Sequence, residues 1–302
     1  MSLDAFQRSG RFFRGNLHTH SNISDGALAP EAVCAHYREA GYDFIALTDH
    51  FIKRYGYPVA DTKRFRTNRF TTIPGAELHA PANSQGEVWH ILSVGLPEDF
   101  APTGEEETGV DLARRAADAG AFVAIAHPQW SSLTVEDGRA LPMAHAVEIY
   151  NHGCALECAR GDGAVLLDTL LNEGRSLTAI ATDDAHFRYD DACGGWVMVK
   201  ADENEPGALL AALKDGHFYA SQGPMIHAAE ISGDALHVEC TPAVNIAVVG
   251  RGSRAVHIRR QQATRAEIPL ERFAGDWFRL VVTDAGGRSA WSNPVRLPPA
   301  GG

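Results

Sequence analysis

The chain lacks any apolar run long enough to span a membrane, and the segment Met1–Arg14 lacks the apolar core of a signal peptide. We therefore expect a cytoplasmic protein with no membrane partner. Basic residues are also in short supply, because 27 Lys and Arg residues stand against 38 Asp and Glu residues and give a net charge of −11. This excess of negative charge argues against general binding to nucleic acid.

Cysteines are few and scattered. They are Cys34, Cys154, Cys158, Cys193 and Cys240. No second Cys or His pair stands at zinc-finger spacing from Cys154 and Cys158, so the sequence favours free thiols over a zinc pair. The chain also lacks a Gly-x-Ser-x-Gly sequence, which disfavours a serine hydrolase.

A possible metal-binding motif stands near the start of the chain, where His18 and His20 are followed by Asp25. Residues two apart on an extended strand point to the same face, so both imidazoles could reach one cation, and Asp25 follows within a short turn. A helix is expected next, because Pro30 suits the first helical turn and Gly41 suits the position after the last one. A single histidine is more often a surface or core residue than a ligand, so the motif needs support from elsewhere.

That support comes from repetition of the pattern along the chain. Ligand-type side chains stand in or beside several short apolar runs: His50, Glu77, His90, His127, Asp184 and His186. The apolar runs alternate with helical segments, which predicts a parallel sheet of the α/β class. Sites in such folds are built at the carboxyl ends of the strands. We therefore predict that these side chains meet at one edge of the sheet and bind metal.

Together these motifs resemble the PHP (polymerase and histidinol phosphatase) family of metal-dependent hydrolases. The resemblance covers residues 15–224 and rests on His18-Thr19-His20, Ser24-Asp25-Gly26, Thr48-Asp49-His50, Gly75-Ala76-Glu77, His90, Ala126-His127-Pro128 and Asp184-Ala185-His186. It implies a distorted (β/α)7 barrel with two or three divalent ions, Zn, Mn or Fe, at its C-terminal face. The segment Gly216–Pro224 and the tail after it resemble the branch named after carbaryl hydrolase, which includes enzymes that attack esters and carbamates.

The resemblance also implies which side chains bind each ion. One ion would be held by His18, His20, Glu77 and Asp184, a second by Asp25, His50 and His186, and a third by Glu77, His90 and His127. Asp25 stands where some family members have histidine. Asp25 or His186 could pass a proton to the leaving group. Asp49 and Asp183, each next to a ligand, are expected to orient the imidazoles.

The implied activity is that of a metal-dependent phosphoesterase acting on a small phosphorylated metabolite or nucleotide, with a metal-bridged hydroxide as nucleophile. A run of basic residues after His50 favours a phosphorylated substrate. We expect four residues of this basic run to bind it: Lys53, Arg54, Arg64 and Arg66. A solvated basic loop is the alternative for this run. Two other functions stay open: a carboxylic ester, carbamate or amide hydrolase using the same metals, and a non-catalytic metal-binding module. Holding so many polar groups together costs free energy, and a non-catalytic module has no physical reason to do so.

The pattern of apolar runs and turn residues changes after Pro224. A chain of 302 residues can hold one large domain or two of unequal size. Residues 225–302 show short alternating runs separated by turn residues, which predicts a β-sandwich of the Ig-like type after a barrel over residues 1–224. His237 and His257 in this tail read as ordinary surface residues. The tail could bind a partner or sugar, wall the active site, or form the interface of a homo-oligomer.

Overall fold

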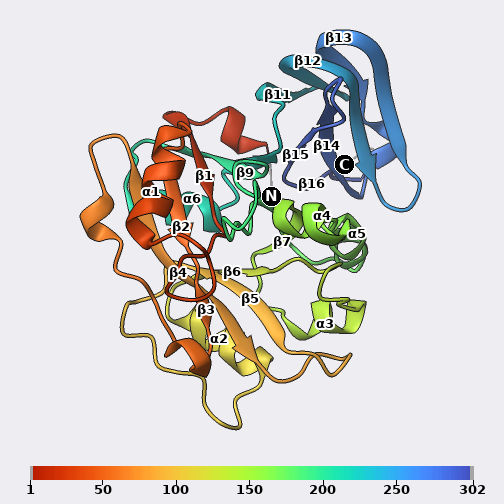
Figure 1. Ribbon diagram of the computed structural model, residues 1–302. Helices are drawn as coiled ribbons and strands as arrows, with labels where there is room; N and C mark the ends of the chain where they lie inside the picture. Colours follow the sequence, from red (N-terminus) through yellow and green to blue (C-terminus); the bar gives the residue numbers. More distant parts are fainter. Residues whose placement is uncertain (1–2, 300–302) are drawn as a thin grey trace.

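The computed structural model describes residues 3–299 and is built around one large, strongly curled sheet (Figure 1). Its strands form a 16-stranded sheet whose hydrogen-bonded path runs β11-β12-β14-β15-β10-β9-β1-β2-β4-β5-β6-β7-β8, with β13 on β12, β16 on β14 and β3 on β4. The fold is therefore of the mixed α/β class, as predicted. Among residues 3–299, no helix is both long and apolar enough to cross a membrane.

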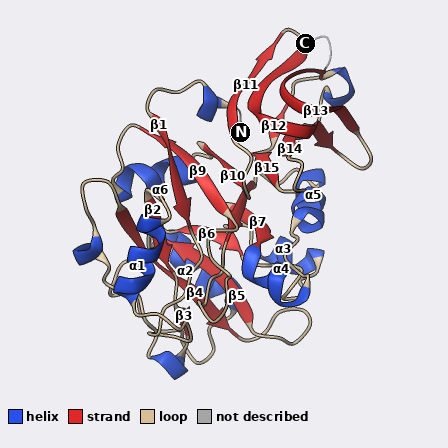
Figure 2. Cartoon of the chain, turned by 45° about the horizontal axis from the view of Figure 1, so that its top comes forward, coloured by secondary structure: helices blue, strands red, loops and turns tan. Residues whose placement is uncertain are grey.

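The part of the chain that carries the predicted ligands alternates strands with short helices. Its elements are η1 Asp4–Phe6, β1 Arg11–Asn16, α1 Pro30–Glu39, β2 Phe44–Leu47, β3 His50–Phe51, η2 Lys53–Tyr55, η3 Lys63–Phe65, β4 Thr71–Ala80, β5 Trp89–Val94, α2 Gly109–Asp118, β6 Phe122–Ile125, α3 Val135–Ala140, β7 Ala146–Asn151, α4 His152–Cys158, α5 Ala164–Asn172, β8 Thr178–Thr182, β9 Trp196–Ala201, α6 Pro206–Lys214 and β10 Phe218–Ser221. In Figure 2, α1 and α6 lie on the left of these strands and α3, α4 and α5 lie on the right.

The expected all-parallel sheet is only partly present. Strands β1, β2 and β4 are parallel, and so are β6, β7 and β8. Strand β5 is antiparallel to both β4 and β6. The β4–β5 pair is antiparallel because the short connection over residues 81–88 forms a hairpin, whereas a parallel crossover needs a dozen or more residues.

The closed (β/α)7 barrel is not confirmed either. Strand β8 ends the hydrogen-bonded path, and it lies next to β9 and β10 without forming a ladder with them. Within residues 3–299, the isolated parallel bridge between Thr19 and Ala185 connects the segments that follow β1 and β8. The sheet therefore curls round without closing.

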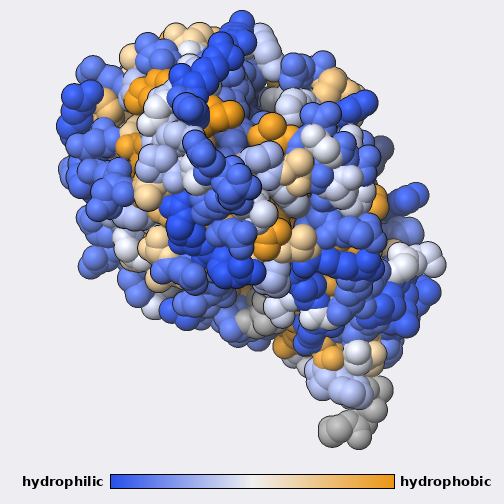
Figure 3. Space-filling view, turned by 90° about the horizontal axis from the view of Figure 1, so that it is seen from below, coloured by the Kyte–Doolittle hydropathy of each residue, from blue (hydrophilic) through white to orange (hydrophobic). Residues whose placement is uncertain are grey.

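Apolar side chains fill the space between this sheet and its helices. Helix α2 packs on β4, β5 and β6, and α5 packs on β7. Phe122, Leu112 and Leu167 are among the completely buried core residues. The face seen from below is mostly hydrophilic, with hydrophobic residues scattered over it (Figure 3). This packing gives the carboxyl ends of the strands a rigid support.

The tail is β-rich, as predicted, but its strands are longer than the sequence indicated. Its elements are β11 Ile226–Ser232, β12 Ala235–Gly250, β13 Ala255–Pro269, η4 Glu271–Phe273, β14 Trp277–Thr283, β15 Ser289–Ser292 and β16 Val295–Arg296. β12 and β13 form a long hairpin with irregular register around Ala243, so turn-like residues there form a bulge in place of a break.

The tail continues the main sheet through the β10–β15 ladder, in which Ala220 pairs with Trp291. It also lies against α5 (Figure 1), where Arg279 forms an ion pair with Asp168 at 2.9 Å. The division of the chain after residue 224 stays a prediction.

Candidate metal centre

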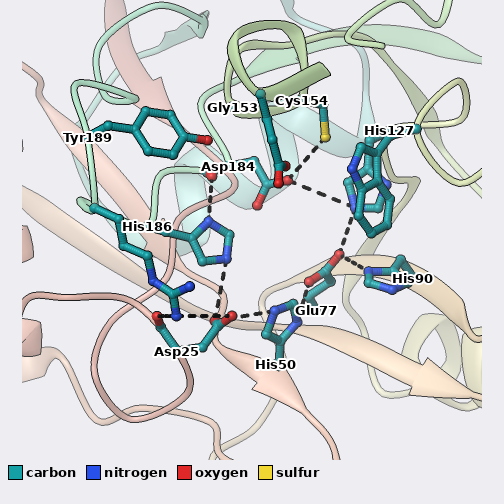
Figure 4. A pocket seen from close by; sticks show the side chains of 13 residues that line it. Asp25, His50, Glu77, His90, His127, Gly153, Cys154, Asp184, His186 and Tyr189 are labelled. Atoms are coloured by element: carbon teal, nitrogen blue, oxygen red, sulfur yellow. Dashed lines mark hydrogen bonds and ion pairs between the residues drawn. The ribbon is translucent and has the colours of Figure 1, made fainter. Parts of the chain in front are cut away.

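The side chains predicted as metal ligands converge on one pocket with a volume of about 240 Å³. Those that line it are Asp25, His50, Glu77, His90, His127, Asp184 and His186 (Figure 4). His18 and His20 lie completely buried behind them, and His20 Nε2 is 3.0 Å from Asp184 Oδ1. Segments far apart in the sequence thus contribute to one cluster.

The backbone explains why the first and last motifs meet. The His20 amide donates a hydrogen bond to the Ala185 carbonyl, and the Asp184 amide donates to the His18 carbonyl. His18 and His20 lie just beyond the end of β1, in an extended segment paired with residues that follow β8. Asp184 has a φ of 53°, a left-handed conformation that is uncommon outside glycine but that Asn, Asp and His adopt more readily than other residues, and that clusters at functional sites.

The first group of side chains has the spacing that a metal ion requires. Bond lengths of about 2.0–2.2 Å place the ligands of a tetrahedral ion about 3.3–3.6 Å apart. His18 Nε2 lies 3.2 Å from Asp184 Oδ1 and 3.6 Å from Glu77 Oε1, and His20 Nε2 lies 3.7 Å from Glu77 Oε2. These four side chains could therefore surround one ion with little movement.

The other two predicted groups differ from each other in spacing. Asp25 Oδ1 lies 3.4 Å from both His50 Nε2 and His186 Nε2, again the separation of ligands on one ion. Glu77 Oε1 lies only 2.8 Å from His90 Nδ1 and 2.9 Å from His127 Nε2, which are hydrogen-bond lengths. The first group also contains such a contact, 3.0 Å between His20 Nε2 and Asp184 Oδ1, so hydrogen-bond lengths and ligand spacings occur together in this cluster.

Unpaired buried atoms support the fit between these residues and divalent ions. His18 Nε2, His20 Nδ1 and Glu77 Oε2 are buried and form no hydrogen bond with any residue between 3 and 299. Leaving a buried polar atom unpaired costs about 1–3 kcal/mol. A cation in the cluster would give His18 Nε2 and Glu77 Oε2 a bond where the protein supplies only ion-pair contacts, at 3.2 Å to Asp184 Oδ1 and 2.6 Å to His50 Nδ1.

The charge state of the cluster also favours a cation. Burial opposes ionisation of Glu77, but nearby His90, His50 and His18 hold the pKa of its carboxyl well below the usual value. The same holds for Asp184: burial raises the pKa of its carboxyl, but His18 and His20 lower it by more, so the pKa lies well below the usual value. Both carboxylates are therefore charged at neutral pH in a site closed to most water.

Glu148 is the important residue that the sequence analysis missed. Its Oε1 lies 2.7 Å from His18 Nδ1, and its Oε2 accepts hydrogen bonds from the His127 amide and Asn151 Nδ2. It is completely buried in β7. The available signal was a charged residue in the middle of an otherwise apolar strand, which can persist only with partners.

His79 and Cys154 were also missed. His79 follows Glu77 on the same face of β4, and its Nε2 lies 2.8 Å from His50 Nδ1. The Cys154 thiol donates to Asp184 Oδ2 at 3.8 Å, and burial raises its pKa, so it stays protonated. Both side chains contact predicted ligands directly.

Asp49 and Asp183 lie close to the cluster but contact loops in place of imidazoles. Asp49 accepts hydrogen bonds from the backbone and hydroxyl groups of Ser21 and Ser24, which holds the turn that carries Asp25. Asp183 accepts from the Tyr37 hydroxyl and from the amides of residues 193–195. Both carboxylates therefore hold loops in place, whereas we expected them to orient imidazoles.

The basic run does not reach the pocket. None of the four predicted substrate residues is among the residues that line it: Lys53, Arg54, Arg64 and Arg66. The Arg66 guanidinium donates to the side chain and the carbonyl of Thr72, so it anchors the loop. The cation that does line the pocket is Arg188, which donates to the Asp25 carbonyl at 2.6 Å.

Comparison with solved structures supports the fold. A two-domain protein from Bacteroides vulgatus, described as containing a predicted PHP-like metal-dependent phosphoesterase, is 18% identical and covers 91% of each chain with a TM-score of 0.53. A candidate metal-dependent phosphoesterase from Bifidobacterium adolescentis is 13% identical over 59% of this chain and 90% of its own, with a TM-score of 0.44. An amidohydrolase from Chromobacterium violaceum is 14% identical over 59% of this chain and 89% of its own, with a TM-score of 0.38.

The first likeness shows that the chain shares the PHP-like fold of the Bacteroides protein. No family model matches the sequence, and the curated proteins give no match either. The resemblance to the branch named after carbaryl hydrolase stays a prediction.

Proposed function

We propose that this chain is a metal-dependent phosphoesterase that hydrolyses a small phosphate ester. The observation that carries the proposal is the convergence of the predicted imidazole and carboxylate ligands on one pocket that also contains a guanidinium, Arg188. The PHP-like fold supports a metal-dependent hydrolase as the broader class. A catalytically silent module would have no use for such a costly cluster beside an open pocket.

The residues that would hold the ions follow from the spacing. His18, His20, Glu77 and Asp184 would hold one ion. Asp25, His50 and His186 would hold a second. When bound, divalent ions of the zinc, manganese or iron type lower the pKa of coordinated water and polarise the ester.

Arg188 would bind the phosphoryl group. Its side chain is 59% exposed, and only one guanidinium nitrogen is committed to the Asp25 carbonyl. A guanidinium binds two phosphate oxygens in a planar arrangement, which orients the ester as well as attracting it. Arg188 also offsets the negative charge that Glu77 and Asp184 leave at the pocket.

Asp25 and His186 are the predicted ligands best placed to contact the leaving group. Their side chains are 28% and 24% exposed, the highest fractions in the predicted ligand set. Burial opposes ionisation of Asp25, but His186 and His50 hold the pKa of its carboxyl well below the usual value, so Asp25 would relay a proton taken up from bound water. A proton donor must reach the leaving oxygen to within hydrogen-bond distance, which the completely buried His18 and His20 cannot do. Arg188 lies 3.9 Å from Asp25 Oδ2, so the anion site and the proton donor adjoin each other.

Hydrolysis of a carboxylic ester, carbamate or amide is the second candidate. The observation that favours it is that Arg188 is the only Lys or Arg among the described residues that line the pocket. A single exposed guanidinium is a modest anion site, and ions that polarise a phosphoryl oxygen can also polarise a carbonyl oxygen.

The test is metal analysis of the purified protein, followed by assays of nitrophenyl phosphate, acetate and carbamate before and after metal removal. We expect at least two bound divalent ions and phosphate ester turnover that is lost on chelation and restored by metal. Arg188→Ala should raise KM for the phosphate ester about tenfold or more, since hydrogen bonds to charged groups contribute about 1.5–3 kcal/mol. Turnover of the carboxylate ester alone, or phosphate turnover without metal, would overturn the proposal.

A further inference from the structure

Exposed aromatic side chains are concentrated at the candidate metal centre. Among residues 3–299, seven large hydrophobic side chains are exposed, and the two aromatic ones, Trp130 and Tyr189, both line the pocket. Trp130 is 37% exposed and Tyr189 is 49% exposed. Aromatic rings left open at a pocket usually contact a ligand, because exposing them to water otherwise brings no benefit.

Trp130 is held directly against the cluster. It lies in the turn after His127, and its ring centroid is 5.0 Å from that of His127 and 5.4 Å from that of His90, both in edge-on geometry. The Ser131 hydroxyl is hydrogen-bonded to His127 Nδ1 at 2.9 Å, which further fixes this turn. The indole is therefore a rigid wall whose remaining surface faces the pocket.

Tyr189 approaches from the opposite side. Figure 4 shows Tyr189 and His127 on opposite sides of the pocket, with Asp184 between them. The loop that carries Tyr189 is tied down by the buried Asp191 carboxylate, which accepts from the amides of His186 and Phe187. The neighbouring Arg188 places its guanidinium at the same rim. Two aromatic rings and one cation thus border the entrance.

We infer that the substrate is a phosphate ester of an aromatic or other planar alcohol. The planar group lies between Trp130 and Tyr189, and the phosphoryl group points to Arg188 and the cluster. This inference rests on the proposed function and adds the chemical class of the leaving alcohol to it. Aliphatic phosphate esters of equal size are poorer ligands, because they fill the space without the favourable ring geometry.

The size of the preference follows from ring–ring contacts. Such contacts contribute about 0.5–1.5 kcal/mol beyond the burial of area, which corresponds to a preference of about 2- to 12-fold for each ring. Contacts with both Trp130 and Tyr189 should give an aromatic ligand about tenfold tighter binding than its saturated analogue.

The test measures binding of non-hydrolysable probes to the metal-loaded protein by calorimetry. The probes are phenylphosphonate, cyclohexylphosphonate and methylphosphonate. We expect phenylphosphonate to bind about tenfold tighter than cyclohexylphosphonate. Trp130→Leu should reduce that difference to about threefold, the share that Tyr189 retains, while leaving the affinity for methylphosphonate unchanged, and Trp130→Phe should keep most of it. Val165→Ala, at an exposed hydrophobic residue that does not line this pocket, is the control variant and should change nothing.

A second pair of probes separates this inference from the proposed function. Benzoate and cyclohexanecarboxylate carry the same two rings on a carboxylate. If the phosphonates fail to bind but benzoate is preferred and Trp130→Leu weakens the preference, the aromatic site between Trp130 and Tyr189 is supported and the phosphoesterase proposal is wrong. If wild-type protein shows no preference for the aromatic member of either pair, or if Trp130→Leu leaves the preference undiminished, the inference is overturned.

Discussion

At the scale of single residues, Glu148 determines how His18 is presented. Its Oε1 lies 2.7 Å from His18 Nδ1, so it fixes the imidazole with Nε2 turned toward Glu77 and Asp184. It also accepts from the Thr182 hydroxyl at 2.7 Å. A carboxylate behind a metal-binding histidine both orients the ring and makes it a stronger ligand.

We therefore predict that Glu148→Gln weakens metal binding about 10- to 100-fold without unfolding the chain, the usual effect of removing such a partner. Titration with a metal-competing dye gives the affinity, and circular dichroism checks the fold. Glu230→Gln, at an exposed residue of the tail, is the matched control. Unchanged affinity in Glu148→Gln would show that His18 does not bind metal through Nε2.

His79 poses a different question, because it could be a ligand or a partner of one. The 2.8 Å between His79 Nε2 and His50 Nδ1 is a hydrogen-bond length, shorter than the roughly 3.3–3.6 Å between two ligands of one tetrahedral ion. His50 Nε2 meanwhile faces Asp25. His50 Nδ1 also lies 2.6 Å from Glu77 Oε2, so we assign His79 the role of holding the His50 ring together with Glu77.

The expected outcome for His79→Leu is metal affinity lower by about 10- to 100-fold with the same number of ions bound at saturation. His79→Gln should recover most of the affinity, because its amide oxygen can accept the same hydrogen bond. Elemental analysis at saturating metal gives the number of ions. Loss of one ion from His79→Leu at saturation would instead identify His79 as a ligand.

Residues announced by a local motif were easier to predict than those that act through the fold. His18, His20 and Asp25 were predicted from spacing, and His127 from its place after an apolar run. Glu148 and Asp191 act only because strands and loops distant in sequence pack around them. The basic run was misleading, because charge density in a sequence does not tell which way a loop faces, and the pocket cation is Arg188.

At the scale of elements, α3 and the β4–β5 connection stabilise each other through Asp137. Its carboxylate accepts from the amide and the hydroxyl of Ser84, at 2.8 and 2.7 Å, and forms a capping box with Thr134. Burial raises the pKa of Asp137, but the hydrogen bonds from Ser84 and Thr134 more than compensate and hold it below the usual value.

A lowered pKa has a definite consequence for stability. The charged form of Asp137 is preferred in the folded state, so its stabilisation is complete above the unfolded pKa and is lost as the pH falls through the folded pKa. We predict that Asp137→Asn lowers the free energy of unfolding by about 1 kcal/mol at pH 7, the usual cost of a lost cap, and by less at acid pH. Urea unfolding at both pH values tests this. An equal loss at both would contradict the assigned charge state.

Elements with strong periodicity were predicted closely and short ones were missed. The helix expected to begin at Pro30 and to end before Gly41 is α1, Pro30–Glu39. The short helices α3 and α4 were not predicted, because six or seven residues show too little periodicity to be recognised. The long strands β12 and β13 were expected as shorter runs, since a bulge and a turn contain the same residue types.

At the scale of the whole molecule, the tail is tied to the rest of the chain through one buried cation. The Arg279 side chain is 7% exposed and pairs with Asp168 of α5, which is 32% exposed. Trp277 Nε1 also donates to Asn172 Oδ1 at 2.9 Å. Together with the β10–β15 ladder, these contacts predict that residues 1–224 and 225–302 unfold in one transition.

The two partners of this ion pair should differ in their effect when removed. Asp168→Ala leaves a buried guanidinium unpaired, and the cost should approach the roughly 3–5 kcal/mol seen when a buried pair is broken. Arg279→Met leaves a carboxylate that water can partly solvate and fills the space with an apolar chain, so its cost should be smaller. Urea unfolding, followed by near-ultraviolet circular dichroism, measures both. If Asp168→Ala costs no more than Arg279→Met, the buried ion pair does not tie the tail to the rest of the chain. If wild-type protein already unfolds in two steps, the tail is an independent unit and the continuous sheet does not make unfolding cooperative.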